Sequence, residues 1–203
     1  MNLYPELVEY IRQFTPDRIS DERKKVLEPL IAYIREVRKE GRVVQLHFIC
    51  THNSRRSQLA QLWAQLAAKA HQVEATTFSG GVEVTAFNER AVAAIQRAGF
   101  RVAAHGETNL EYVVSYAEEE KPLKMYSTLY DAPENPVKDF AAVMTCTHAD
   151  ENCPFIPGAS ERIPVRYDDP KAFDGTDQET EKYDERSAQI GNEMFYVFEM
   201  VAK

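Results

Sequence analysis

The chain is expected to form an α/β domain in which helices flank a four-stranded parallel sheet. Short apolar runs alternate with segments of helical periodicity, and polar or glycine-rich residues follow the apolar runs. Such alternation favours a parallel sheet that binds its ligands beyond the carboxyl ends of the strands. The chain has 203 residues and is 44% hydrophobic, which is enough for one substantial core.

The first part of the chain, residues 1–41, is expected to form two helices. Ser20 is a typical N-cap for the second helix, acidic residues occupy its first turn, and Gly41 ends it. The apolar positions that recur at helical spacing are Val26, Leu27, Leu30, Ile31, Ile34 and Val37. We interpret residues 1–41 as an N-terminal helical extension that packs on the sheet of a domain spanning 42–203. A dimerisation arm is the alternative.

Residues 42–203 carry the signals for the sheet and its helices. The predicted strands are 43–49, 75–79, 141–145 and 163–167, and the predicted helices are 57–70, about 86–99 and 178–202. Between them, residues 111–130 contain two strand-like runs separated by charged residues, which predicts a hairpin. We expect this hairpin to be an insertion that covers one side of the ligand site.

The loop between the first predicted strand and the next helix reads Cys50-Thr51-His52-Asn53-Ser54-Arg55-Arg56-Ser57. A strand would deliver the Cys50 thiol to the sheet edge, the loop would turn backbone N–H groups inward, and the helix start would add partial positive charge. This arrangement predicts a cradle for a tetrahedral oxyanion and a thiolate nucleophile. The alternative is an ordinary buried cysteine at a strand end, because free cysteine is among the most buried residue types.

This loop and the helix start after it resemble the signature of the low-molecular-weight protein tyrosine phosphatase superfamily, which includes the thioredoxin-coupled arsenate reductases. The similarity extends over roughly 43–202 and implies the flavodoxin-like fold of that superfamily. By this resemblance Cys50 is the nucleophile, and Arg56 clamps two oxygens of the oxyanion. Asn53 holds the loop in shape with a left-handed backbone, and Ser57 donates a hydrogen bond to the thiolate. The other residues expected to line the oxyanion site are Thr51, His52, Ser54 and Arg55.

Two loop positions depart from the superfamily pattern. His52 stands where glycine is usual; it would strain the loop if its φ were positive, or its imidazole would cap the pocket. Arg55 stands where a second cysteine is frequent. It removes any disulfide within the loop and adds positive charge, and we expect its side chain to point outward.

The other two cysteines, Cys146 and Cys153, follow the third predicted strand. In the arsenate reductase branch, cysteines at these positions pass electrons by thiol–disulfide exchange, so the resemblance implies a relay that starts at Cys50. A helix over 147–153 would separate the two Cα atoms by roughly 10 Å. Because a disulfide usually requires about 4.4–6.8 Å, we expect this segment to be mobile. Passive buried cysteines, or a zinc site that adds His148, are the alternatives.

Asp168-Asp169-Pro170 follows the fourth predicted strand. The superfamily aligns the residue before the proline, Asp169, as the general acid, and we expect a raised pKa for a carboxyl group near an anion-binding loop. The proline restricts Asp169 to extended geometry, which helps to aim its side chain. A turn is the alternative use of these residues.

The resemblance implies an arsenate reductase that uses the Cys50/Cys146/Cys153 relay and takes electrons from thioredoxin. The first alternative is a low-molecular-weight protein tyrosine phosphatase that hydrolyses phosphomonoesters through a phosphocysteine. Its aromatic substrate would need a wall beside the pocket, and the candidates are Tyr112, Tyr116 and Tyr126. The second alternative is a non-enzymatic module that binds an anion or a partner, with its loop disabled by the two departures.

Composition limits the partners and the compartment. The net charge of −8 argues against a nucleic-acid partner. No apolar stretch approaches the roughly 20 residues of a membrane span, so we expect a cytoplasmic protein without a membrane partner. In a reducing compartment the three cysteines are expected to remain thiols. We expect no cofactor and no metal ion; the latter includes potassium, because Gln61 stands where some relatives have an acidic ligand.

Overall fold

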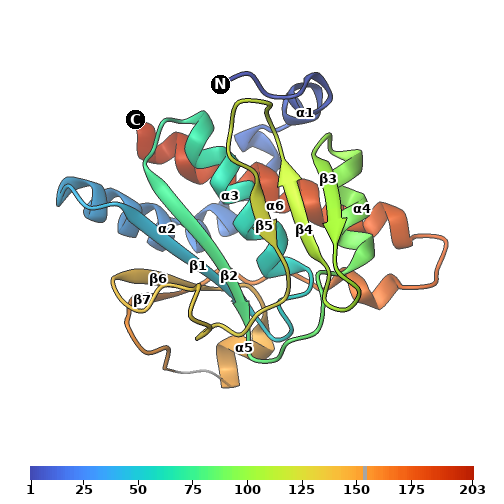
Figure 1. Ribbon diagram of the computed structural model, residues 1–203. Coiled ribbons are helices and arrows are strands. Elements are labelled where there is room, and N and C mark those ends of the chain that lie inside the picture. Colours follow the sequence, from blue (N-terminus) through green and yellow to red (C-terminus); the bar gives the residue numbers. More distant parts are fainter. Residues whose placement is uncertain (153–154) are drawn as a thin grey trace.

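A parallel four-stranded sheet lies at the centre of the molecule (Figure 1). The computed structural model describes residues 1–152 and 155–203. The strands follow the order β2-β1-β6-β7, and every pairing between them is parallel. Their bounds are β1 Val44–Cys50, β2 Ala75–Gly81, β6 Phe140–Met144 and β7 Ala159–Pro164. The predicted fold class is therefore confirmed.

Three helices cover one face of this sheet (Figure 1): α2 Asp21–Lys39, α3 Arg56–Ala70 and α6 Glu179–Ala202. Side chains of successive strand residues point to opposite faces. Accordingly, Leu46 and Phe48 of β1 lie in the main core with these helices, whereas Ile49 lies in a smaller cluster. The smaller cluster includes Tyr130 and Ala149, which belongs to α5 (Thr147–Asn152). The sheet is thus buried on both faces, as parallel sheets usually are.

The last strand differs from its prediction. β7 begins at Ala159, whereas the sequence predicted a strand over 163–167. The early residues of β7 are largely exposed, so they lack the apolar pattern on which the prediction depended. Hydrogen bonds continue past the strand, because Val165 N–H donates to Met144 O at 2.9 Å and Tyr167 N–H donates to Thr145 O at 3.1 Å. These bonds carry the chain to Asp169 at the carboxyl edge of the sheet.

The predicted hairpin is part of a three-stranded antiparallel sheet, with the order β3-β4-β5. Its strands are β3 Arg101–His105, β4 Glu111–Ser115 and β5 Leu123–Met125. The sequence did not predict β3, because most of its residues are exposed and show no apolar alternation. Helix α4 (Glu89–Arg97) precedes this sheet, and its buried face is Ala91, Val92, Ala94 and Ile95.

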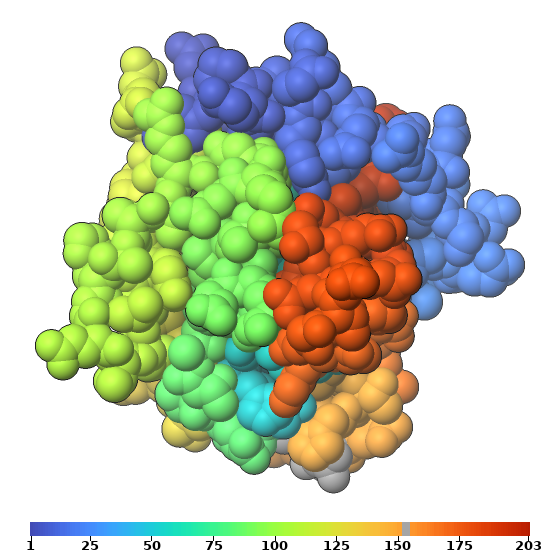
Figure 2. Space-filling model, turned by 90° about the vertical axis from the view of Figure 1, so that its right-hand side faces the viewer, coloured from blue at the N-terminus to red at the C-terminus, as the bar shows by residue number. Residues whose placement is uncertain are grey.

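Residues 1–41 form α1 (Pro5–Ile11), a 3-10 turn (η1, Pro16–Arg18) and α2. Ser20 caps α2 by accepting a hydrogen bond from Arg23 N–H, and Gly41 has a φ of +69° after the helix, as predicted. Arg23 holds α2 on α6 through two hydrogen bonds of 2.8 Å to the buried carboxylate of Glu193. In Figure 2 the blue N-terminal residues lie against the red C-terminal helix. None of the described helices is both long and apolar enough to span a membrane.

Candidate active site

The loop that follows β1 curls with its carbonyl oxygens facing outward. The carbonyl oxygens of residues 50–55 all accept hydrogen bonds, from Val82 N, Glu83 N, Ser127 Oγ, Gln58 Nε2, Asn88 N and Leu59 N in that order. No backbone N–H group from Thr51 to Arg55 donates to another described residue. Successive N–H groups that face a common concavity form an anion-binding nest. The N–H groups of this loop are thus left for a ligand, as the predicted cradle requires.

Asn53 fixes the shape of the loop. Its φ is +45°, the left-handed conformation predicted for it. Its side chain is fully buried: Oδ1 accepts from Thr128 N–H at 2.9 Å and from Gln58 Nε2 at 3.2 Å, and Nδ2 donates to Ser57 Oγ at 2.9 Å. These bonds offset the cost of the left-handed backbone and keep the amide from rotating.

The same network orients the hydroxyl group of Ser57 toward the nucleophile. Ser57 Oγ lies 3.1 Å from Cys50 Sγ. Because this oxygen already accepts from Asn53 Nδ2, its own hydrogen is available for the sulfur. Hydrogen bonding to a charged form favours that form. The geometry therefore suits the predicted donation to a Cys50 thiolate.

His52 occupies the usual glycine position without strain. Its φ is not positive, so the strained alternative for this residue does not apply. The imidazole lies at the pocket wall, with Nε2 3.5 Å from the Glu83 carboxylate. The loop backbone instead comes close to β2 at Gly81, where a Cβ atom would lie 2.7 Å from Asn53 N and 2.9 Å from His52 C. The glycine that this loop needs is thus supplied by the neighbouring strand β2.

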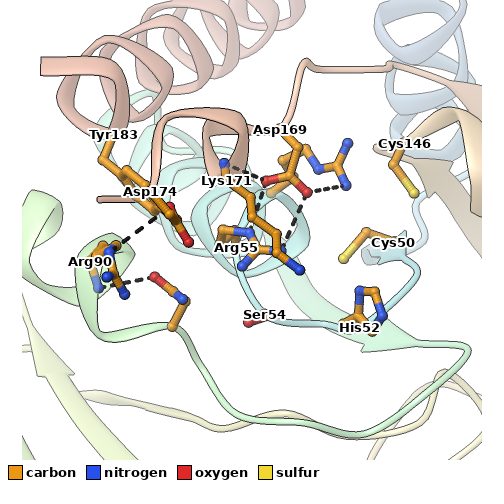
Figure 3. A network of polar contacts seen from close by, with 12 residues as sticks. Cys50, His52, Ser54, Arg55, Arg90, Cys146, Asp169, Lys171, Asp174 and Tyr183 are labelled. Atoms are coloured by element: carbon orange, nitrogen blue, oxygen red, sulfur yellow. Dashed lines mark hydrogen bonds and ion pairs between the residues drawn. The ribbon is translucent and has the colours of Figure 1, made fainter. Parts of the chain in front are cut away.

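Two arginines, Arg55 and Arg56, form ion pairs with Asp169, and Figure 3 shows Arg55 and Asp169 on the same side of Cys50. Arg56 Nη2 lies 2.8 Å from Asp169 Oδ2, and its Nη1 donates to Tyr167 O at 3.0 Å. Arg56 Nε is buried and has no acceptor among the described residues. A buried donor without a partner is rare and costly, so this nitrogen remains available to an acceptor atom of a bound ligand.

Arg55 points inward, contrary to the prediction. Its Nε lies 2.9 Å from Asp169 Oδ1, and only 8% of the residue is exposed. The ion pair with Asp169 places an opposite charge beside this guanidinium group. The pocket lined by these residues has an empty volume of about 170 Å³, but its side chains leave no room for a water-sized sphere. In this arrangement the Asp169 carboxylate occupies the guanidinium groups that an oxyanion would use.

The pKa of Asp169 is lowered, not raised as predicted. Burial alone would raise it, but the positive charges of Arg56 and Arg55 favour the carboxylate and reverse the direction. The Asp169 side chain also caps a short 3-10 helix, η2 (Pro170–Phe173), because its Oδ1 accepts from Lys171 N–H at 3.1 Å. In this closed arrangement Asp169 is a counter-ion for the loop rather than a proton donor.

Comparison with known proteins gives the family. No protein family model matches the chain. An arsenate reductase from Staphylococcus aureus (strain Newman) is 32% identical over 127 residues, which cover 62% of this chain and 77% of that protein. This chain belongs to the arsenate reductase family. Another arsenate reductase, from Halalkalibacterium halodurans, is 28% identical over 134 residues, which cover 66% of this chain and 79% of that protein.

The fold of this arsenate reductase family member is also that of solved low-molecular-weight protein tyrosine phosphatases. One from T. tengcongensis superposes with a TM-score of 0.51 at 14% identity, covering 77% of this chain and 98% of that one. The resemblance seen in the loop sequence thus extends to the architecture.

In this family member, β6 brings a second cysteine to the nucleophile loop. β6 pairs with β1 in parallel register, so its end delivers Cys146 to the same edge as Cys50. Both cysteines are buried and belong to one cluster of packed side chains. Cys146 Sγ lies 3.4 Å from Thr51 Oγ1, and Figure 3 shows Cys146 beside the start of the loop. Two thiols far apart in the sequence therefore meet at one site.

Cys153, the third cysteine of the predicted relay, lies outside the described residues, as does part of the predicted mobile segment and of the alternative zinc site. The described part of that segment is helical, since α5 spans Thr147–Asn152. It is tied down by Asp150, which forms ion pairs with Arg162 and Arg166.

Sequence reasoning missed the residues that support the loop from outside. Gln58 is fully buried and donates to Asn53 O at 3.0 Å and to Tyr126 O at 2.8 Å. Ser127 and Thr128, just after β5, also bond to the loop. A glutamine on the inner face of an otherwise apolar helix was the available signal for Gln58. The short polar residues at 127–128 carried none.

The proposed aromatic wall does not form. Tyr112 and Tyr116 of the antiparallel sheet are 8% and 2% exposed and pack in the main core. The third candidate, Tyr126, bonds through its hydroxyl group to Glu134 at 2.8 Å. Burial and hydrogen bonding, rather than substrate contact, account for these side chains.

Proposed function

We propose that the protein reduces arsenate to arsenite with a relay of three thiols. The Cys50 thiolate attacks arsenic and displaces one oxygen as water, forming a sulfur–arsenic bond. The Cys146 thiolate then attacks Cys50 sulfur: the S–S bond forms, the S–As bond breaks, and its electron pair leaves with arsenic as arsenite. Cys153 next attacks Cys146 and frees Cys50. Two thiols are thus oxidised for each arsenic reduced.

The observation that carries this proposal is the meeting of two buried cysteines at one anion-binding loop. A phosphatase needs one nucleophile, whereas a reductase must find two electrons. The parallel pairing of β1 and β6 supplies the second sulfur where the first is used. Membership of the arsenate reductase family supports the same substrate.

Substrate binding would also restore an acid role to Asp169. An oxyanion that binds the guanidinium groups of Arg55 and Arg56 neutralises the two positive charges that hold the Asp169 pKa down. Asp169 could then take up a proton and deliver it to the departing oxygen. The unpaired Arg56 Nε adds a further donor for the oxyanion once the ion pairs open.

The electron donor in this proposal is thioredoxin, acting on a Cys146–Cys153 disulfide, and the location is the reducing cytoplasm. Such a location keeps the three thiols reduced between turnovers. Neither a metal ion nor an organic cofactor is part of the proposal, because the electrons come from thiols and the oxyanion is held by guanidinium and N–H groups.

One pair of assays tests the function. Arsenate-dependent oxidation of a thioredoxin system and hydrolysis of an aryl phosphate are measured for the parent protein and for Cys153→Ser. Loss of only the first activity in Cys153→Ser supports the reductase. Absence of arsenate-dependent oxidation in the parent protein would refute it.

A second candidate function is phosphomonoester hydrolysis through a phosphocysteine. The specific observation in its favour is Asp169 at the pocket mouth, since a leaving phenolate needs a proton more than a hydroxide does. Its first step is the same attack by Cys50. Aryl phosphate hydrolysis by the parent protein, retained in Cys146→Ser, is the expected result if this activity exists.

A further inference from the structure

Cys146 is buried, yet in the proposed function it must lose a proton before it attacks. Only 1% of the residue is exposed, so water does not reach the sulfur in this arrangement. The thiolate, not the thiol, is the nucleophile in disulfide exchange. The site therefore needs a path by which the Cys146 proton leaves.

A row of three polar side chains connects this sulfur to the surface. Cys146 Sγ lies 3.4 Å from Thr51 Oγ1, and the same oxygen lies 3.2 Å from His148 Nδ1. Thr51 is 9% exposed, whereas His148, on the outer side of α5, is exposed. A hydroxyl group can accept one hydrogen bond while it donates another. The row thus leads from the buried Cys146 thiol, through the Thr51 hydroxyl group, which can accept one proton and give up another, to the solvent-exposed imidazole of His148.

The sulfur also accepts a hydrogen bond from within α5. Ala149 N–H donates to Cys146 Sγ at 3.4 Å. This bond favours a negatively charged sulfur once the proton has left. Thr51 would be a second donor to the sulfur. After the thiol proton has moved to Thr51 Oγ1, the hydroxyl group can donate that same hydrogen back to the thiolate as a hydrogen bond.

We infer that His148 is the proton acceptor for Cys146, acting through the hydroxyl group of Thr51. The Cys146 thiol gives its proton to Thr51 Oγ1 as Thr51 gives its own to His148 Nδ1. The products are a thiolate and an imidazolium ion, so the net charge of the three side chains is unchanged. This inference rests on the proposed relay and adds to it a positioning pair, Thr51 and His148, for the second chemical step.

The other charged groups near Cys146 form ion pairs with one another. Asp150 of α5 forms ion pairs with Arg162 and Arg166, and its backbone N–H donates to Cys146 O at 3.1 Å. On the loop side, Arg55 and Arg56 are paired with Asp169. Histidine is the side chain whose ordinary titration lies near neutral pH. Among the described residues, His148 is the group whose ring nitrogen lies within hydrogen-bond distance of Thr51 Oγ1, and a neutral imidazole nitrogen can accept a proton.

The first experiment measures thiolate formation without arsenate. The double variant Cys50→Ser/Cys153→Ser leaves Cys146 as the sole cysteine of the chain. The ultraviolet absorbance of its thiolate is titrated against pH, alone and combined with His148→Ala or His148→Asn. The asparagine can still accept from Thr51 but cannot take a proton. Both substitutions should raise the midpoint by about one pH unit, a tenfold loss of thiolate.

The second experiment measures the step itself. In Cys153→Ser, the Cys50–Cys146 disulfide that forms after mixing with arsenate is trapped by acid quenching. His148→Ala should slow its formation about tenfold or more, and added imidazole should restore part of the rate. Thr51→Val should slow it equally, Thr51→Ser should preserve it, and the pair Thr51→Val/His148→Ala should be no slower than either alone.

The outcomes separate this inference from the proposed function. A midpoint unchanged in His148→Ala, or a His148→Asn protein that behaves as the parent, would overturn the role of His148. If the midpoint shifts but the parent protein reduces no arsenate, the proton path stands and the proposed function falls. His148 is exposed, so its variants are expected to fold, and circular dichroism checks this.

Discussion

Asp169 Oδ2 lies 2.8 Å from Arg56 Nη2, so the carboxylate of the candidate acid holds the arginine that is expected to bind substrate. Acid and clamp neutralise one another while the pocket is closed. A substrate oxyanion must compete with Asp169 for the same guanidinium group. Binding and activation of the acid are therefore coupled through one ion pair.

Asp169→Asn should separate these two roles. Without the negative charge the arginines are free, so the KM for arsenate should fall several-fold. Aryl phosphate hydrolysis, where present, should lose about 10² to 10⁴ in kcat because the leaving group has no acid. The matched control is Asp168→Asn, whose side chain is 97% exposed. A KM for arsenate that is unchanged or raised in Asp169→Asn would show that the ion pairs do not limit entry.

Ser57→Ala should weaken the Cys50 nucleophile. The hydroxyl group lies 3.1 Å from the sulfur, and a hydrogen bond to a charged group is worth about 1.5–3 kcal/mol. The rate of Cys50 alkylation by iodoacetamide, in a Cys146→Ser/Cys153→Ser background, should fall about 10- to 100-fold. Ser57→Thr keeps the hydroxyl group and should recover most of the rate. Equal alkylation rates for Ser57→Ala and for the protein with Ser57 would show that this hydroxyl group does not activate Cys50.

Gly81→Ala should damage the loop from the neighbouring strand. The new Cβ atom would lie 2.7 Å from Asn53 N and from Glu83 O, so the loop backbone must shift. Relative to the parent protein, the loss of arsenate-dependent activity should be larger than the loss of thermal stability. Gly106→Ala is the control, because its φ of +97° makes it strained while nothing lies within 4 Å of the added atom. It should lose stability, measured by thermal unfolding, but retain activity.

His47 should make the protein sensitive to mild acid. It is fully buried near Phe78 and Phe140, and burial lowers its pKa to about 3. The unfolded chain binds a proton below about pH 6.5, whereas the folded protein does not. The free energy of unfolding should therefore fall by up to about 1.4 kcal/mol per pH unit below that pH.

His47→Phe should remove this part of the pH dependence, as urea unfolding at several pH values would reveal. The exposed His105 provides the control, since His105→Phe should leave the dependence unchanged. A pH slope that is the same in His47→Phe and in the parent protein would rule out this source of acid sensitivity.

Arg23→Ala should show how strongly the N-terminal helices stabilise the domain. Arg23 satisfies both oxygens of Glu193, which is 2% exposed, and donates to Arg166 O at 3.0 Å. Removing one partner of a buried pair usually costs about 3–5 kcal/mol, because the other charge remains buried. Arg12→Ala removes an exposed pair with Glu9 and should cost less than about 1 kcal/mol. A small effect of Arg23→Ala on urea unfolding would mean that α2 adds little to the fold.

Local patterns were enough to predict most of the architecture. Apolar runs, helix periodicity and the cap at Ser20 depend on neighbours in the chain, so β1, β2, α2, α3 and α6 were predicted from sequence. β3 was missed and β7 was shifted, because an exposed strand shows no apolar alternation. Their hydrogen-bond partners, which only the folded chain provides, define them.

By itself the sequence determined the chemistry of the loop: a thiol at a strand end, a left-handed Asn53, a hydroxyl group at Ser57 and the guanidinium of Arg56. These depend on residue type and short spacing. Tertiary structure alone decided that Arg55 points inward, that Asp169 is ionised, and that His148 lies one hydroxyl group away from Cys146. Charge pairing and proton transfer act through space over a few ångströms. Residues about a hundred positions apart come within that distance only when the parallel strands align their carboxyl ends.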